Sequence, residues 1–318
     1  MKKLLVIILA LALTVLPLVS CNSDTHNDTV DTNSIEQTTE ALTTEAPTTE
    51  AATEEENKLV AYVDDPLLNE IANKIAQSDS YLIFSIGDSL AEGQGSSDAK
   101  NLDYTAMFTK KLGEQFPEKS VYRVDSKREK ETQTLKYSAP ISIQTGTGAS
   151  KITVVRSGYG GNTVKRITAR STDFINKKIK GETGNLFIIC SGINDSATSN
   201  KDKYASPPVY KQQLSDLIDM IYESHPDADV ILMTPTFVGN DGSTIAMYAK
   251  YMRDLAKERE IALIDLNKLW MDHWVKGGEN YGQGDWLNPP PDGDSCHPSD
   301  AGHEAIADEM IRCLFGVN

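Results

Sequence analysis

The chain of 318 residues is short of positive charge: 31 Lys and Arg face 46 Asp and Glu, so the formal net charge is −15. No basic patch is present, which argues against a nucleic-acid partner and leaves no positive face for anionic lipid. A comfortable membrane span is also lacking, because the apolar run at residues 4–18 is too short. Neither a metal nor another cofactor is expected, since no metal-ligand cluster is formed by His26, His225, His273 and His303.

The N-terminus resembles that of a bacterial lipoprotein. A short basic start, Met-Lys-Lys, precedes the apolar run, which has the length of a signal peptide. The run ends in Leu-Val-Ser-Cys at residues 18–21, which looks like a lipobox, a sequence cut before a cysteine that then carries lipid. We therefore expect residues 1–20 to be a lipoprotein signal peptide, and lipid on Cys21 to hold the protein on the bacterial cell membrane, facing outside. The alternative is an ordinary signal peptide that ends near a cysteine.

Residues 22–57 contain ten acidic residues, no Lys or Arg, and almost no large apolar side chains. Such a segment cannot bury enough apolar surface to offset its ordering entropy, so we expect residues 21–57 to be a disordered tether. As a flexible coil it would average roughly 30–35 Å end to end. Removing the two N-terminal lysines and these ten negative charges leaves residues 58–318 with a net charge of −7, which is ordinary for one soluble domain.

The remaining cysteines are Cys190, Cys296 and Cys313. Cys190 falls in an apolar run at residues 186–190 and is expected to be a small buried hydrophobe. A predicted helix at residues 299–315 would hold Cys296 and Cys313 roughly 20 Å apart, whereas a disulfide needs Cα atoms within about 7 Å. We therefore predict no bridge between them, and a bridge between Cys190 and Cys296 stays open.

From residue 64 onward, short apolar runs alternate with amphipathic patterns. Short β-branched runs bounded by turn residues are typical of buried parallel strands. The alternation predicts a parallel sheet with helices on both faces and functional groups at the carboxyl ends of its strands. The segment at about residues 120–151 interrupts the pattern and is interpreted as an inserted hairpin or small β excursion. The predicted strands are residues 81–86, 152–155, 186–190, 230–233 and 261–264, and the predicted helices are residues 104–116, 164–178, 209–223 and 244–258.

Ser89 follows the first of these strands, in Gly-Asp-Ser-Leu at residues 87–90. Backbone N–H groups at a helix start favour negative charge, which suits a nucleophile, although a helix N-cap uses serine equally well. The Gly-x-Ser-x-Gly elbow of α/β-hydrolases is absent, because position 91 is alanine.

Candidate hydrogen-bond donors follow the next two strands. Residues 158–163 read Gly-Tyr-Gly-Gly-Asn-Thr, and glycines let a backbone N–H approach a ligand closely. A plain strand-to-helix turn is the alternative, and the spacing does not match a dinucleotide-binding fingerprint. Asn194, in Gly-Ile-Asn-Asp at residues 192–195, can donate its side-chain amide to an oxyanion, although asparagine is also common in turns.

Asp294 and His297 lie three residues apart, and Pro298 follows. One loop can therefore present both side chains, with the carboxylate holding the imidazole in one tautomer. The alternative is a loop that only starts a helix, since Ser299 and Asp300 make a good cap.

These four blocks, in this order, resemble those of the GDSL or SGNH hydrolases. The resemblance covers residues 81 to about 314, and Pro-Ser-Asp-Ala-Gly-His at residues 298–303 strengthens it. It implies an α/β fold: a flavodoxin-like three-layer α/β/α sandwich with a mostly parallel central sheet.

The resemblance also implies roles for individual residues. Ser89 would be the nucleophile, His297 the base and Asp294 the carboxylate partner. The backbone N–H groups of Ser89 and Gly161 and the side chain of Asn194 would form the oxyanion hole. The spacing from the nucleophile to this glycine is longer than usual for the family, which leaves Gly160 as an alternative to Gly161.

The expected function is a serine esterase that hydrolyses short-chain, especially acetyl, esters on extracellular carbohydrate through an acyl-enzyme. Residues 277–294 are rich in Gly, Pro and Asp, unlike a wall for a long acyl chain, and Tyr281 and Trp286 lie in that loop. A lipase, lysophospholipase or thioesterase is an alternative of the same fold. A non-catalytic glycan-binding module is an alternative of another class, with Trp270, Trp274 and Trp286 as sugar-stacking faces.

Overall fold

The computed structural model describes residues 65–236, 242–277, 285–288 and 296–316, without the side chains of residues 242–243 and 274–277. The predicted signal peptide, Cys21 and the predicted tether therefore lie outside the described residues. Within the part described, no helix is both long and apolar enough to cross a membrane.

A seven-stranded sheet forms the centre of the described domain, with the order β5-β2-β6-β1-β7-β8-β9. Every neighbouring pair is parallel except β2 with the edge strand β5, which is antiparallel. The strands are β1 (Ser80–Gly87), β2 (Ser120–Val124), β5 (Ile141–Gln144), β6 (Lys151–Gly158), β7 (Leu186–Cys190), β8 (Asp229–Met233) and β9 (Ala262–Ile264).

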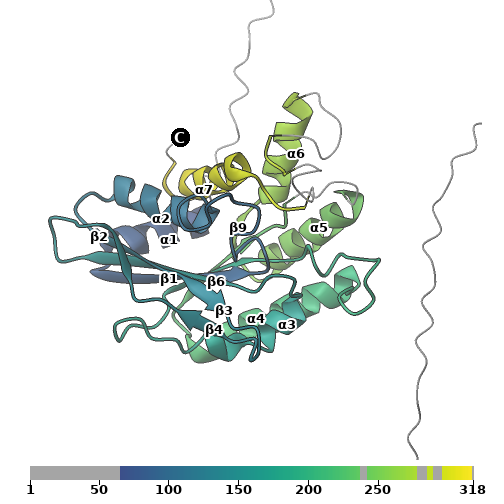
Figure 1. Cartoon of the computed structure of the whole chain (residues 1–318), viewed down its shortest axis with the longest axis horizontal. Helices are drawn as coiled ribbons and strands as arrows, with labels where there is room; N and C mark the ends of the chain where they lie inside the picture. Colours follow the sequence, from purple (N-terminus) through teal and green to yellow (C-terminus); the bar gives the residue numbers. More distant parts are fainter. Residues whose placement is uncertain (1–64, 237–241, 278–284, 289–295, 317–318) are drawn as a thin grey trace, which may run out of the picture. The chain divides into compact units, whose positions relative to one another are not determined.

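Helices cover both faces of this sheet (Figure 1). Helices α1 (Pro66–Gln77), α2 (Tyr104–Gln115), α6 (Leu266–Gly277) and α7 (Asp300–Phe315) contribute to one apolar core, and α3 (Val164–Thr168), α4 (Pro207–Ser224) and α5 (Gly242–Glu258) contribute to the other. The predicted three-layer sandwich with a mostly parallel sheet is confirmed.

Strand β1 shows why the buried strands read as continuous apolar runs. Successive side chains of a strand point to opposite faces, so Ile83 lies in the core under α1, α2 and α7, whereas Leu82 and Phe84 lie in the core over α4 and α5. Phe84 stacks on Phe187 of the neighbouring strand, with ring centroids 5.5 Å apart. Both faces are covered by helices, so polar residues have no solvent side to occupy.

The segment at residues 120–151 contains four strands. β2 and β5 extend the main sheet, and only β3 (Ser126–Arg128) and β4 (Leu135–Tyr137) form a separate two-stranded hairpin. This hairpin packs beside β6 (Figure 1).

The helix predicted over residues 164–178 is wrong beyond Thr168. Helix α3 ends there, and a short 3-10 turn at Ser171–Asp173 follows. Thr168 donates its hydroxyl to the Val164 carbonyl, an i−4 bond that weakens helices. The Arg170 carbonyl accepts the Tyr159 hydroxyl at 3.2 Å, so the chain is held by a neighbouring loop at the point where the helix would continue.

The cysteines carry no bridge within the described domain. Cys190 and Cys313 are free thiols, and both are buried. The prediction of no Cys296–Cys313 bridge is therefore confirmed, and the open alternative of a Cys190–Cys296 bridge is removed. Burial raises the pKa of both buried thiols well above the usual range, so they are packing residues and not nucleophiles.

Candidate active site

Ser89, Gly161 and Asn194 follow three adjacent parallel strands. Strand β1 pairs with β6 on one side and with β7 on the other, and each of the three residues lies within four positions of the end of its strand. Parallel strands end at the same edge of a sheet, so the three loops meet there.

Ser89 and His297 are in hydrogen-bond contact, although 208 positions separate them in the sequence. The Ser89 Oγ lies 2.8 Å from the His297 Nε2. The Ser89 side chain lies in a turn, and the next helix, α2, begins only at Tyr104. The alternative that Ser89 only caps a helix is therefore wrong.

His297 is held in place by Asn288. Asn288 donates its backbone N–H to the His297 carbonyl at 3.2 Å and its side-chain amide to the Pro298 carbonyl at 2.8 Å. The same amide donates to the Gly95 carbonyl at 2.7 Å, which ties the histidine loop to the loop that carries Ser89. Asp294, the predicted partner of His297, lies outside the described residues.

Two backbone donors at this edge have no acceptor within the described residues: the N–H of Ser89 and the N–H of Gly161. The side-chain amide of Asn194 faces the buried carboxyl of Asp88. Gly160 differs, because its N–H donates to the Glu92 Oε2 at 2.9 Å. Gly161 has a φ of +73°, which turns the chain in a way that favours glycine. The geometry thus singles out Gly161, and not Gly160, as the glycine with an N–H left for a ligand.

The amide of Asn194 is oriented by Lys203, which belongs to none of the motifs in the sequence. The Lys203 Nζ donates to the Asn194 Oδ1 at 2.9 Å. An ammonium group only donates, so the amide oxygen must face Lys203 and the Nδ2 must point the other way. A Cβ added to Gly161 would lie 3.5 Å from the same Nζ, which places the lysine beside both loops.

Two buried carboxyls, those of Asp88 and Asp195, accept backbone N–H groups at the site. Asp88 accepts from the Leu90 N–H at 3.1 Å. Burial raises the pKa of Asp88 to about 6. The bond from Leu90 and the nearby side chains of His297, Asn194 and Lys203 act in the opposite direction and lower this pKa. Asp195 accepts the Val164 N–H with both oxygens, at 3.1 and 3.2 Å, and burial raises its pKa to about 7. Asp195 thereby joins the loop after β7 to the first turn of α3.

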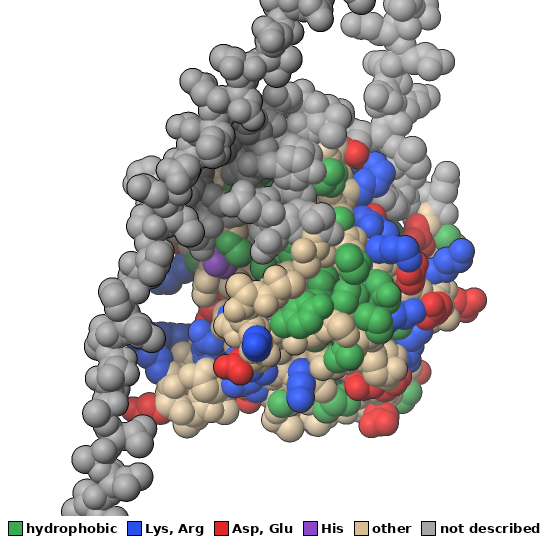
Figure 2. All heavy atoms as spheres, turned by 90° about the vertical axis from the view of Figure 1, so that its right-hand side faces the viewer, with side chains coloured by type: hydrophobic (Ala, Val, Ile, Leu, Met, Phe, Trp, Pro, Cys, Tyr) green, Lys and Arg blue, Asp and Glu red, His purple; other side chains and the backbone are tan. Residues whose placement is uncertain are grey.

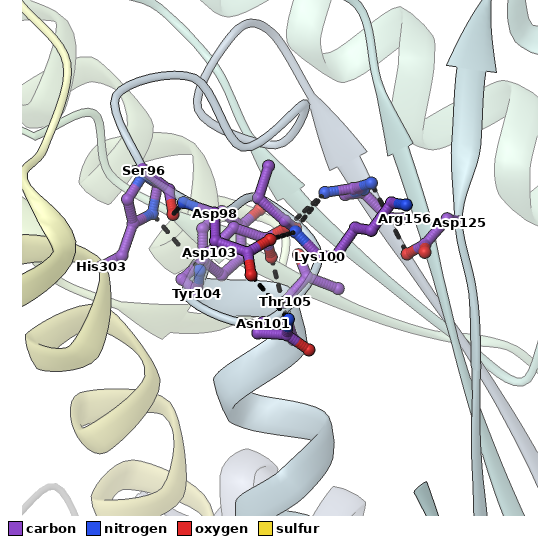
Figure 3. Close-up of polar contacts among 12 residues, drawn as sticks. Ser96, Asp98, Lys100, Asn101, Asp103, Tyr104, Thr105, Asp125, Arg156 and His303 are labelled. Carbon is purple, nitrogen blue, oxygen red and sulfur yellow. Dashed lines mark hydrogen bonds and ion pairs between the residues drawn. The ribbon is translucent and has the colours of Figure 1, made fainter. Parts of the chain in front are cut away.

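The chain that follows Ser89, residues 90–103, is anchored at several points (Figure 3). Arg156 of β6 donates to the Ala99 carbonyl at 2.7 Å and forms a buried ion pair with Asp103, the residue that caps α2. His303 of α7 accepts the Tyr104 N–H at its Nδ1, 3.3 Å away, and its Nε2 lies 3.1 Å from the Gln94 carbonyl. Burial lowers the pKa of His303, which favours the neutral ring that this pair of contacts needs.

Two of the three tryptophans named as sugar-stacking faces pack inside the protein or on another ring. Trp270 is 4% exposed, and Trp286 stacks on His273 at a ring distance of 3.5 Å. The side chain of Trp274 and all of Tyr281 lie outside the described part. Figure 2 shows hydrophobic side chains exposed among charged ones on one face of the molecule. Tyr204, next to Lys203 in the sequence, is 42% exposed, so its aromatic ring reaches solvent.

The described residues contain no group of three or more His, Cys, Asp or Glu side chains that could hold a metal ion. What the site offers is a hydroxyl in contact with an imidazole, next to two unused backbone N–H groups, a side-chain amide and an ammonium group. Such a set can transfer a proton from the hydroxyl and stabilise negative charge on an oxygen atom.

Comparison with known proteins gives a family and a fold. The sequence model of the GDSL-like Lipase/Acylhydrolase family matches residues 137–305, a range that contains Gly161, Asn194 and His297 and begins after Ser89. No curated protein matches this chain in sequence.

Several solved structures share the fold at low sequence identity. An acetyl xylan esterase, AlAXEase, is 18% identical with a TM-score of 0.53, over 74% of this chain and 100% of its own. An acetylxylan esterase from Geobacillus stearothermophilus is 24% identical with a TM-score of 0.50, over 74% of this chain and 94% of its own. A two-domain esterase active on acetylated mannans is 19% identical with a TM-score of 0.53, over 78% of this chain and 52% of its own.

Proposed function

Because this chain belongs to the GDSL-like Lipase/Acylhydrolase family and is a carboxylic ester hydrolase, we propose that it is a serine esterase that removes short acyl groups, in particular acetyl, from extracellular carbohydrate. Ser89 is the nucleophile and His297 the general base. The single observation that carries this assignment is the contact of 2.8 Å between the Ser89 Oγ and the His297 Nε2.

The reaction proceeds in two halves. The His297 Nε2 takes the hydroxyl proton as the Ser89 Oγ attacks the ester carbonyl, and the tetrahedral intermediate collapses when the protonated imidazole gives that proton to the leaving alcohol. Water, deprotonated by the same imidazole, then attacks the acyl-serine. The acid leaves and the proton returns to Ser89, so no cofactor is consumed.

The negative oxygen of each tetrahedral intermediate is held by the N–H groups of Ser89 and Gly161 and by the Asn194 Nδ2. Support comes from the fact that the two N–H groups lack acceptors within the described residues, since a pre-organised donor needs no rearrangement during the reaction. Asp294 orients His297 in this proposal, as the block Asp-Ser-Cys-His implies, and Asp292 is its competitor for that role.

An acetylated carbohydrate substrate has four supports. The similar structures include esterases of acetylated xylan and mannan. Residues 277–294 are rich in Gly, Pro and Asp, which do not make a channel for a long acyl chain. Tyr204 presents an exposed aromatic ring beside Lys203, and such rings stack on sugars. Lipid on Cys21 would display the domain on the outer face of the membrane, where such polymers are found.

The test is the hydrolysis of p-nitrophenyl acetate by the wild type, Ser89→Ala and Ser150→Ala. Ser150 immediately precedes β6, at the opposite edge of the sheet, so it serves as the matched control. We expect Ser89→Ala to lose turnover while keeping its fold, and Ser150→Ala to keep both. A Ser89→Ala protein that retains most of its activity would refute the assignment, and a folded wild type without activity would favour a non-catalytic glycan-binding module.

The substrate class needs a second measurement. We expect the wild type to release acetate from acetylated xylan, mannan or peptidoglycan and to prefer acetyl over octanoyl esters in kcat/KM. A preference for octanoyl esters or lysophospholipids, with no acetate released from any glycan, would instead favour a lipase, and a preference for acyl thioesters would favour a thioesterase.

A further inference from the structure

The β3–β4 hairpin contacts the loop that carries Gly161. Arg128, the last residue of β3, donates from its Nη1 to the Gly160 carbonyl at 2.7 Å. The side chain of Asn162 donates to the same carbonyl at 3.0 Å. A guanidinium donor makes a charge-assisted bond, which is stronger than the bond from the neutral amide.

The Gly160 carbonyl and the Gly161 N–H belong to one peptide unit. That unit is planar and trans, so its oxygen and its hydrogen point in opposite directions. A donor that fixes the direction of the Gly160 oxygen therefore fixes the direction of the Gly161 N–H. The positive charge on the oxygen side also draws electrons away from the nitrogen, which makes the N–H a stronger donor.

The preceding peptide unit is held as well. Glu92 accepts the Gly160 N–H with its Oε2 at 2.9 Å, and Gln94 donates to the same oxygen at 3.0 Å. The other oxygen of Glu92 lies 3.9 Å from the Arg128 Nε. A Cβ on Gly160 would lie only 2.1 Å from the Glu92 Oε2, so this contact requires glycine at position 160. Both peptide units that flank the Cα of Gly160 are thus fixed by side chains.

The hairpin itself is anchored to the main domain, so Arg128 is held in place. The Tyr137 hydroxyl lies 3.0 Å from the Ser157 Oγ of β6, and the Leu135 N–H donates to Asp173 at 3.2 Å. Leu135 is buried in the core shared with α3 and α4. The Arg128 side chain is 27% exposed, so its substitution does not open the core.

We propose that Arg128 is a positioning residue of the esterase, and that the β3–β4 hairpin serves to hold the oxyanion donor at Gly161. This proposal rests on the serine esterase function proposed above. Arg128 does not touch the substrate in this scheme. It acts through the Gly160–Gly161 peptide unit, by setting the direction and the donor strength of one N–H group.

The test compares Arg128→Met, Arg128→Lys and Lys127→Met in the full-length protein. Lys127 is the exposed neighbour on the same strand, so it controls for the loss of a positive charge from the hairpin. The readouts are kcat and KM for p-nitrophenyl acetate, the inhibition constant of a trifluoromethyl ketone, and the melting temperature. Ser89 adds to such a ketone and creates an oxyanion at the position of the transition state, whereas KM reports mainly on the ground state.

Loss of a whole oxyanion donor lowers kcat by about 10²–10³, and Arg128→Met weakens one donor without removing it. We therefore expect kcat to fall about tenfold, the ketone to bind weaker by a similar factor, and KM to change by less than about twofold. Arg128→Lys should regain part of the loss, because it restores the charge without the planar fork. Lys127→Met should match the wild type.

The outcomes separate the two proposals. A wild type without Ser89-dependent turnover overturns the esterase function and this inference with it. If the wild type is active and Arg128→Met has the same kcat as Lys127→Met, the inference alone is overturned. A fall in the kcat of Arg128→Met with unchanged binding of the ketone also overturns it. If Arg128→Met does not fold, the test rests on Arg128→Lys. A kcat and a ketone inhibition constant equal to those of the wild type would then overturn the inference.

Discussion

The amide of Asn194 connects two charged groups of the site: its Oδ1 accepts from Lys203 at 2.9 Å, and its Nδ2 faces Asp88. Asn194→Ala removes both contacts, so the melting temperature is recorded beside kcat. We expect kcat to fall by about 10²–10³, the usual loss for one oxyanion donor, with little change in KM, because the bond strengthens in the transition state.

Lys203 should act through this amide. Its bond of 2.9 Å to the Asn194 Oδ1 is charge-assisted, and such bonds contribute about 1.5–3 kcal/mol. Lys203→Met leaves the Asn194 amide present but free to turn. We therefore expect a loss near the lower end of this energy range, about tenfold in kcat or about 1.4 kcal/mol. In the Asn194→Ala background the same substitution should have no further effect, which gives a coupling of about 1.4 kcal/mol.

The assay is a double-mutant cycle on kcat for p-nitrophenyl acetate, with Lys201→Met as the control. Lys201 is an exposed lysine of the same loop, and it should match the wild type. Additive losses from Asn194→Ala and Lys203→Met would refute the idea that the lysine works through the amide. A large change in KM at normal kcat would instead make Asn194 a substrate-binding residue.

Four further predictions follow from the site and the termini. Asp294→Asn should lower kcat strongly while Asp292→Asn should not, as measured by ester hydrolysis, and equal defects would leave the orienting role unassigned. Cys21→Ala should release the protein from the membrane fraction or block its processing, and wild-type protein found entirely in the medium with unmodified Cys21 would contradict lipidation. Tyr204→Ala should raise KM for an acetylated oligosaccharide but not for p-nitrophenyl acetate, and equal effects on both would remove the ring from substrate binding. Burial raises the folded pKa of Asp88 to about 6 from an unfolded value of 3.8, so this carboxyl should contribute a loss of stability as pH rises from 4 to 7. Urea unfolding should show Asp88→Asn gaining about 2 kcal/mol relative to the wild type across that range, and a constant difference would contradict the shift.

The sheet was predictable because its strands are short apolar runs that end in turn residues. The run at residues 186–190 matches β7, and the run at residues 81–86 falls one residue short of β1 at each end. Helices were predicted less well. Helices α1 and α6 were missed, and α3 was predicted too long, because its end is decided by a contact between Tyr159 and Arg170 that no local pattern contains.

The site also contains residues that the sequence predicts and residues that it does not. Ser89, Gly161, Asn194 and His297 stand in motifs with recognisable spacing, so a sequence can nominate them. Lys203 and Arg128 stand in polar segments with no motif, and their relevance comes from distances of 2.9 and 2.7 Å to groups far along the chain. The sequence also could not decide between Gly160 and Gly161, because the Glu92 carboxylate that accepts the Gly160 N–H lies 68 positions away in the chain.

The central position of β1 has a consequence for how the protein inactivates on heating. Ser89, Gly161 and Asn194 follow β1 and its two direct neighbours, so edge strands β5 and β9 can fray without disturbing the three loops. His297 is not carried by a strand of the sheet. Beyond its own contact with Ser89, its loop is tied to the Ser89 loop by Asn288, and helix α7 adds bonds from Asp300 and His303. The half of the site that carries the nucleophile should therefore persist until the whole domain melts. Loss of activity at temperatures below the melting transition would originate on the histidine side.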